Sequence, residues 1–132
     1  PLFAAETGDH IKCSWKPDNF STYEDLILIE RDFPEKEDIA AEKIFIKAPE
    51  KNGSLLTQLS QKHFEISFEQ ELEKLPFLGI WWCNNGWGDG RDHRTIAIEP
   101  CTHDSDIPPK NNELKTGKGC KYNILIRLKP IH

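Results

Sequence analysis

The sequence predicts an all-β fold, an antiparallel β-sandwich, and three features of the chain support this prediction. Short apolar runs alternate with turn residues throughout the chain, as in proteins built from many short strands. Residues 63–69 carry apolar side chains at every second position, which is the period of a strand with one buried face. No long segment repeats its apolar residues with the helical period. We therefore expect residues 1–132 to form one β-sandwich unit.

The individual strands are predicted in chain order from these apolar runs. They cover residues 11–15, 25–29, 43–47, 53–59, 63–69, 77–83, 95–99 and 119–128. In the strand at 63–69, Phe64, Ile66 and Phe68 are expected to share the buried face. The strand at 77–83 is apolar on both faces, so we expect it to lie between two layers.

The connections are predicted from turn residues. Residues 33–41 are acidic and contain Pro34, which favours a loop or a short helical turn. Asn52-Gly53 is the dipeptide of a hairpin turn. Residues 104–118 contain two adjacent prolines and two adjacent asparagines, so they are predicted to form a loop.

Composition and charge exclude several classes of partner. With 37% hydrophobic and 30% charged residues, the chain has the composition of a globular protein and not of a disordered one. A net charge of -5 provides no overall basic field for a phosphate backbone, so we expect no nucleic-acid partner. No apolar run approaches the roughly 20 residues of a membrane span, so we expect no membrane partner either.

The four cysteines lie far apart in the sequence; they are Cys13, Cys83, Cys101 and Cys120. An even number allows disulfides in a secreted protein, but no basic and then apolar signal segment opens the chain. We favour free thiols inside strands and a cytoplasmic location. Disulfide bonds are the alternative.

Residues 78–87 concentrate the side chains that bind sugars, with three tryptophans and two asparagines. Tryptophan faces stack on the C–H faces of ligands, and asparagine both donates and accepts hydrogen bonds. Trp81 and Trp82 are adjacent and must point to opposite faces of their strand, so at least one belongs to the core. The candidate substrate-binding residues of this segment are Trp82, Asn84, Asn85 and Trp87.

Glu99 ends the short apolar strand at 95–99. Thr95, Ala97 and Glu99 share one face of that strand, and the small neighbours leave room for a ligand. Pro100 has no N–H group, so we expect it to end the ladder of backbone hydrogen bonds. A carboxylate at such a strand end is a candidate general base.

Two interpretations in which these residues have only a structural role stay open. Glu99 can be a rim carboxylate that pairs with Arg91 or Arg94. Asn84 and Asn85 can simply form the turn after their strand.

Two histidines, His93 and His103, follow these strands in a loose cluster of acidic residues. The acidic members are Asp89, Asp92, Asp104 and Asp106. Their spacing matches no zinc motif, so we expect no metal. Each histidine is a candidate substrate contact and proton donor near Glu99, because imidazole commonly exchanges protons near neutral pH.

Residues 79–87 (GIWWCNNGW) and 96–102 (IAIEPCT) resemble the C-terminal half of the aldose 1-epimerase (galactose mutarotase-like) superfamily. The resemblance is closest to a poorly characterised bacterial branch. It implies a supersandwich fold in which the strand that ends in Glu-Pro carries the catalytic base, Glu99. The Leu-x-x-Gly turn before the last strand of the family is matched by residues 114–117. The resemblance covers essentially the whole chain but only about half of a typical member.

The resemblance also carries expectations about what precedes Pro1. Family members have a His-Pro pair there, with the histidine as general acid, so residues 1–132 are expected to be the C-terminal half of a larger domain. We expect this chain by itself to be inactive. Half a sandwich exposes apolar surface and open sheet edges. We therefore expect a homodimer, strand swapping, aggregation or association with the missing N-terminal half.

The implied activity is the interconversion of sugar anomers without a cofactor or metal. Glu99 would take the proton of the anomeric hydroxyl, and a histidine would protonate the ring oxygen, so that the ring opens and closes from its other face. The expected partner is a small-molecule carbohydrate. One alternative is a non-catalytic carbohydrate-binding module with the same groove. A structural or regulatory domain is another, but it does not explain the tryptophans and asparagines.

Overall fold

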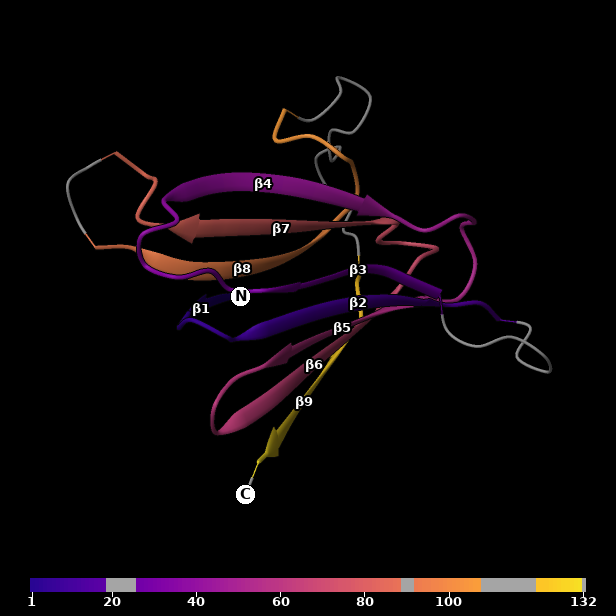
Figure 1. Ribbon diagram of the computed structural model, residues 1–132. Helices are drawn as coiled ribbons and strands as arrows, with labels where there is room; N and C mark the ends of the chain where they lie inside the picture. The colour runs from indigo at the N-terminus through magenta and orange to yellow at the C-terminus, as the bar shows by residue number, and fades with distance from the viewer. Residues whose placement is uncertain (19–25, 89–91, 108–120, 132) are drawn as a thin grey trace.

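The computed structural model describes residues 1–18, 26–88, 92–107 and 121–131. Within these residues the chain forms nine strands and no helix, and the strands pair antiparallel in two sheets that face each other (Figure 1). The predicted all-β sandwich is therefore confirmed. No helix in these ranges has the length and apolar character that a membrane crossing needs.

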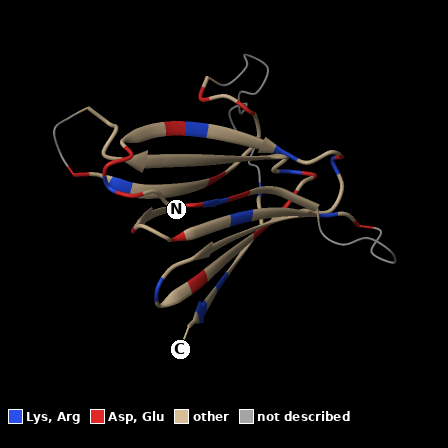
Figure 2. Cartoon of the chain, in the orientation of Figure 1, with Lys and Arg blue, Asp and Glu red and all other residues tan. Residues whose placement is uncertain are grey.

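The two sheets contain four and five strands. The four-stranded sheet has the order β1-β8-β7-β4, with β1 at Leu2–Ala4, β8 at Arg94–Cys101, β7 at Phe77–Asn84 and β4 at Ala40–Lys47. The five-stranded sheet has the order β3-β2-β5-β6-β9, with β3 at Leu26–Asp32, β2 at His10–Lys16, β5 at Ser54–Ser60, β6 at Phe64–Glu71 and β9 at Ile124–Pro130. Acidic and basic residues are interspersed over both sheets (Figure 2).

The core lies between the sheets and is filled by alternate residues of the central strands. Ile80 of β7 lies opposite Ile98 of β8, and Trp82 lies opposite Ile96, and all four side chains are buried. Because side chains alternate along a strand, the residues between them face away from the core. That outward side of the four-stranded sheet is called its outer face below.

The outer face of β7 differs from the expectation of a strand between two layers. The sequence predicts a layer on each side of residues 77–83, but among the described residues no strand packs on the outer side of β7, where Trp81 and Cys83 line a cavity. Trp81 is accordingly only half-buried.

The sandwich is splayed at the end of the five-stranded sheet, where β9 lies far from the four-stranded sheet (Figure 1). Ile126 of β9 lies beside the buried Phe68 of β6, so the inner face continues across β9. The prediction that Phe64, Ile66 and Phe68 share one face fits this register. However, burial fades toward the open end, where Phe64 and Leu128 are exposed.

Pro100 does not end the ladder of β8, contrary to expectation. The strand continues to Cys101, and Pro100 lies opposite Leu78 of β7. The Ile98 N–H points away from β7 and donates to the Pro1 carbonyl oxygen. The Pro100 nitrogen, two residues later, points to the same side of β8. No described strand covers the edge at Pro100, so its missing N–H costs no ladder bond.

The predicted turns are partly right. Residues 33–39 form the loop before β4. Gly53 has a φ of 78°, and a Cβ there would lie 1.9 Å from the Lys16 carbonyl oxygen, so only glycine fits. The turn joins β4 to β5 in the other sheet, however, so it is not a hairpin within one sheet.

Candidate functional site

The candidate site lies on the outer face of the four-stranded sheet, where β4, β7 and β8 run side by side. As predicted, Thr95, Ala97 and Glu99 share one face of β8, and the intervening Ile96 and Ile98 are fully buried in the core. Across the sheet, Glu99 lies beside Gly79 of β7.

Two adjoining cavities of about 510 and 470 Å³ open on this face. We name the larger one the Trp87 cavity; the lining residues used below are Trp81, Trp87, His93 and Thr95. The smaller one is the Tyr122 cavity; the corresponding residues are Phe45, Thr102, His103, Ser105 and Tyr122. Lys43, Glu99 and Asp106 line both cavities and therefore lie at their junction.

An aromatic corner forms one wall of the Trp87 cavity. The rings of Trp81 and Trp87 meet edge to face, with centroids 5.3 Å apart and an interplanar angle of 86°. Trp87 is 61% exposed, so most of its ring is open to a ligand. The chain reaches this position through Asn85, whose φ of 57° is left-handed, and through Gly86, which packs directly on the backbone of Ala40.

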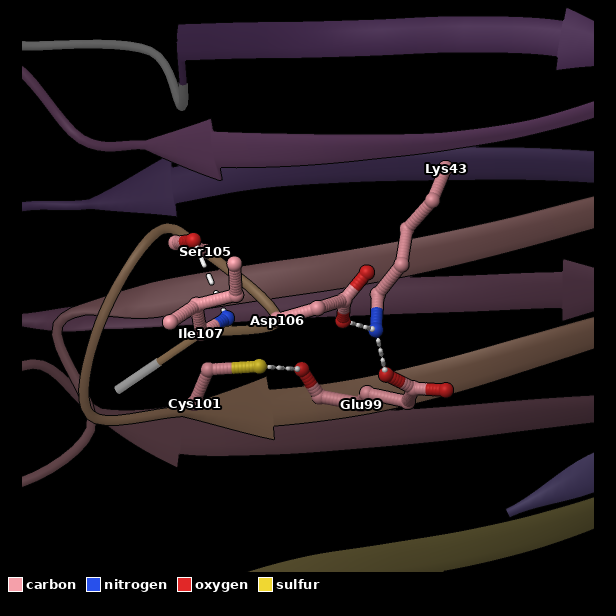
Figure 3. Close-up of polar contacts among 6 residues, drawn as sticks. All are labelled: Lys43, Glu99, Cys101, Ser105, Asp106 and Ile107. Atoms are coloured by element: carbon pink, nitrogen blue, oxygen red, sulfur yellow. Dashed lines mark hydrogen bonds and ion pairs between the residues drawn. The ribbon is translucent and has the colours of Figure 1, made fainter.

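The junction of the cavities is built from a cation between two carboxylates (Figure 3). The Lys43 Nζ lies 2.6 Å from the Glu99 Oε2 and also pairs with the Asp106 carboxylate. Burial lowers the pKa of Lys43, but its hydrogen bonds to Asp106 and Glu99 outweigh this effect and raise that pKa above its usual value. Lys43 therefore carries its charge at neutral pH.

Gly79 makes this arrangement possible. Lys43 is on β4 and Glu99 on β8, so the lysine side chain must cross the intervening strand β7. A Cβ at Gly79 would lie 3.3 Å from the Lys43 Cε, which is a tight contact, and 3.5 Å from the Glu99 Cβ, which is ordinary van der Waals contact. The lack of a side chain at this position gives the lysine room to reach the carboxylate.

Cys101 borders the same junction but is not activated. Its thiol donates a hydrogen bond to the Glu99 carbonyl oxygen at 2.8 Å (Figure 3). Burial raises the pKa of the Cys101 thiol, so it stays protonated at neutral pH and is a poor nucleophile. Cys13, Cys83 and Cys101 are all free, whereas Cys120 lies outside the described residues.

Two of the predicted substrate-binding residues are in the interior. Trp82 is buried on the inner face of β7 and packs on Phe33, with ring centroids 5.0 Å apart, while the Arg31 guanidinium lies over its ring. Asn84 is fully buried and donates to the carbonyl oxygens of Glu35 and Asp38. Neither side chain lines the Trp87 cavity or the Tyr122 cavity, so the prediction that they contact the ligand is corrected.

Asn85 fits the turn interpretation. Its N–H donates to the His93 carbonyl oxygen at 2.7 Å, and its side-chain Oδ1 is buried without a hydrogen-bond partner among the described residues. Asn85 thus shapes the bend that leads to Trp87 and does not line either cavity as described.

The expected partner of Glu99 is also corrected. Arg94 donates to the Asn84 Oδ1 at 2.9 Å and lies over the Phe33 ring, so it is committed to the interior. Arg91 lies outside the described residues. The cation that pairs with Glu99 is therefore Lys43 and not the arginine that the sequence suggested.

The two candidate histidines lie on opposite sides of the junction. His93 lines the Trp87 cavity, and His103 lines the Tyr122 cavity with its Nδ1 2.9 Å from the Thr102 Oγ1. Within residues 1–18, 26–88, 92–107 and 121–131, no three His, Cys, Asp or Glu side chains converge as metal ligands would. Asp89, another member of the predicted cluster, lies outside these residues, as do residues 114–117.

Sequence reasoning missed Trp81 and Lys43. A signal for Trp81 existed, since Leu78, Ile80 and Trp82 form the more apolar set of alternate positions in β7, which marks Trp81 as outward-facing. No local signal identifies Lys43, because its contact with Glu99 depends on strand order.

The arrangement combines aromatic faces, a carboxylate and an imidazole around a cavity large enough for a small ligand. Such a set can stack on a polyol ring and move a proton. A scan against protein-family models gave no matching family, and searches of curated proteins and of solved structures gave no match either.

Proposed function

We propose that the outer face of the four-stranded sheet binds an aldose and interconverts its anomers, as aldose 1-epimerases do, with Glu99 as the base. The observation that carries the proposal is the position of Glu99 in the same cavity as the exposed face of Trp87 and the imidazole of His93. Sugar rings stack on aromatic faces through their C–H groups, and mutarotation needs only proton transfers.

The proposed reaction is a balanced pair of proton transfers. The Glu99 carboxylate takes the proton of the anomeric hydroxyl while His93 donates a proton to the ring oxygen. The bond between the anomeric carbon and the ring oxygen breaks, which gives the open-chain aldehyde. After rotation about the neighbouring carbon–carbon bond, the reverse transfers close the ring in the other anomer and restore both side chains.

Lys43 acts in this scheme as a positioning residue. Its ammonium group holds the Glu99 Oε2, which leaves Oε1 for the anomeric hydroxyl. A fixed carboxylate loses less freedom when the substrate binds, and correct orientation is a large part of catalysis.

The same ion pair favours a second candidate function. Lys43 occupies one oxygen of the Glu99 carboxylate, and both groups can hydrogen-bond to sugar hydroxyls without any proton transfer. The alternative proposal is therefore a non-catalytic carbohydrate-binding module that uses Trp81 and Trp87 for stacking and the ion-paired cluster for hydrogen bonds to hydroxyl groups.

Two further observations support the proposed cellular location and the proposed larger fold. Free thiols at Cys13, Cys83 and Cys101 suit a reducing compartment, which supports a cytoplasmic location. The splayed end of the sandwich supports the proposal that the fold is part of a galactose mutarotase-like supersandwich, with a further half that packs on the open side.

NMR exchange spectroscopy on a panel of aldoses tests the catalytic proposal. The assay uses the full-length parent protein, because residues 1–132 by themselves are expected to be inactive. We expect exchange between anomers above the buffer rate, and a loss of roughly 100-fold or more of that excess in Glu99→Gln. Glu65→Gln, on the other sheet, is the matched control and should exchange like the wild type. Exchange at the buffer rate in the wild type contradicts the isomerase; saturable binding of the same sugars would then favour the binding module.

A further inference from the structure

We infer that the site takes a saccharide of at least two uncharged sugar units, with the second unit in the Tyr122 cavity. This inference rests on the proposed function for the first unit, which occupies the Trp87 cavity. Its starting point is that the Trp87 and Tyr122 cavities, of about 510 and 470 Å³, are each within the range of small-ligand pockets, roughly 300–1,000 Å³.

Only a few side chains separate the two cavities. It consists of the side chains of Lys43, Glu99 and Asp106, which line both cavities. The Asp106 side chain is 67% exposed, so it forms a rim and not a wall. A ligand that contacts Glu99 from the Trp87 cavity can therefore continue over this rim into the Tyr122 cavity.

The lining of the Tyr122 cavity has the chemistry of a second sugar subsite. Phe45 and Tyr122 supply aromatic faces, and Tyr122 is 43% exposed. Thr102, Ser105 and His103 supply hydroxyl and imidazole groups that can hydrogen-bond to sugar hydroxyls. The combination repeats that of the Trp87 cavity, where aromatic faces lie beside polar groups.

The charges at the junction argue against a phosphorylated ligand. Lys43 is the only Lys or Arg among the described residues that line the two cavities, and it is paired with two carboxylates. A phosphoryl group prefers arginine or lysine donors that it does not share with other anions. The extension beyond the first sugar is therefore expected to be uncharged.

Calorimetric titrations test the inference with reducing disaccharides that all carry glucose at the reducing end. The probes are sophorose, cellobiose, lactose and melibiose, with glucose and glucose 6-phosphate for comparison. We expect at least one disaccharide to bind roughly tenfold more tightly than glucose, which corresponds to one further stacking contact. Glucose 6-phosphate should bind no more tightly than glucose.

Variants then locate the second unit. In Tyr122→Ala the ratio of disaccharide to glucose affinity should fall to about one, and in Leu26→Ala, an exposed apolar position on the other sheet, the ratio should not change. As a measurement that does not depend on a variant, the disaccharide but not glucose should shift the backbone amide signals of Thr102 and Ser105.

The outcomes separate the two proposals. A tenfold ratio that depends on Tyr122, without anomer exchange, supports the second subsite and contradicts the isomerase. Exchange of glucose with no disaccharide preferred, or with tighter binding of glucose 6-phosphate, overturns the subsite and leaves the isomerase standing. No saccharide binding at all overturns both.

Discussion

Trp82 and Trp87 are close in sequence but have opposite environments. Trp82 is 2% exposed and contacts Phe33 and Arg31, whereas Trp87 is 61% exposed in the Trp87 cavity. Removal of a buried tryptophan loses its transfer free energy and leaves a cavity. Removal of an exposed one changes stability little but takes a stacking face away from a ligand.

We therefore predict a reversal of effects in two alanine variants. Trp82→Ala should lower the free energy of unfolding by about 3–5 kcal/mol, as measured by urea denaturation. Trp87→Ala should change it by less than about 1 kcal/mol but should weaken sugar binding in a calorimetric titration. Equal losses of stability in the two variants would contradict the assigned positions.

His10 provides a prediction about pH. Its Nδ1 lies 2.6 Å from the Asp32 Oδ1, and its Nε2 lies 3.0 Å from the Glu30 Oε1, so the ring links β2 to β3. The hydrogen bond to Asp32 raises the pKa of His10 above 6.5; burial opposes this, and Glu30 adds to the rise. The stability from this raised pKa is fully present below pH 6.5 and is lost as the pH rises through the higher value of the folded state.

The free energy of unfolding should consequently fall between pH 6 and pH 9 in the wild type, and His10→Gln should flatten this fall. Urea denaturation at several pH values measures both slopes. Parallel slopes would show that His10 does not gain a proton on folding.

The candidate site was only partly predictable from single residues. The alternation of Thr95, Ala97 and Glu99 was enough to place the carboxylate on the face with small neighbours. The sequence could not supply the partner of Glu99, because the contact with Lys43 depends on the strand order β8-β7-β4 and on the space that Gly79 leaves on the intervening strand. The choice of Trp82 over Trp81 failed because the apolar set of alternate positions that contains Leu78, Ile80 and Trp82 was not used to assign Trp82 to the core.

At the scale of elements, the strands with clear alternation or a continuous apolar run were predicted well. β2, β5, β6, β7 and β8 each include the predicted range to within a residue or so. The other strands were predicted less well. β3 continues three residues past its predicted end, and β4 begins three residues before its predicted start. β1 has only three residues, too few for a periodic pattern, and β9 begins at Ile124. The first residues of the predicted last strand lie outside the described part of the chain.

The bend after β7 depends on the contact between Gly86 and β4. A Cβ at Gly86 would lie 2.5 Å from the Ala40 carbonyl carbon and 2.6 Å from the Ala41 nitrogen, both backbone atoms. The start of β4 would have to move, and such overpacking costs about 1–3 kcal/mol.

Gly86→Ala is accordingly expected to destabilise the protein more than Gly8→Ala does. Gly8 has a φ of 87° and no atom within 4 Å of a new Cβ, so its substitution costs only backbone strain, about 1–2 kcal/mol. Urea denaturation compares the two. A Gly86→Ala variant as stable as the wild type would show that β7 and β4 do not meet at this point.

At the scale of the whole molecule, the dominant feature is the unequal closure of the sandwich. The four-stranded sheet covers the centre of the five-stranded sheet, but β9 is left as an edge strand with exposed apolar side chains. Ile126 and Leu128 on its inner face are 55% and 62% exposed. Open edges with apolar faces are templates for pairing with another chain.

The isolated chain is therefore predicted to self-associate, and Leu128→Glu should reduce that association. Leu128 is already exposed, so the substitution should not unfold the protein. Sedimentation velocity over a range of concentrations gives the measurement, and Ile39→Glu, at an exposed site in a loop, is the control. A wild-type chain that stays monomeric at every concentration would contradict the prediction.

The central claim is that a sugar binds on the outer face of the four-stranded sheet, beside Glu99. A titration of the ¹⁵N-labelled protein with aldoses and disaccharides, followed by NMR chemical shifts, tests it most directly. The account predicts saturable shifts in the indole N–H signals of Trp81 and Trp87 and in the amides around Glu99. The indole signal of Trp15, on β2 of the five-stranded sheet, should stay unchanged. Shifts spread over both sheets, or no saturable shift with any sugar, would contradict it.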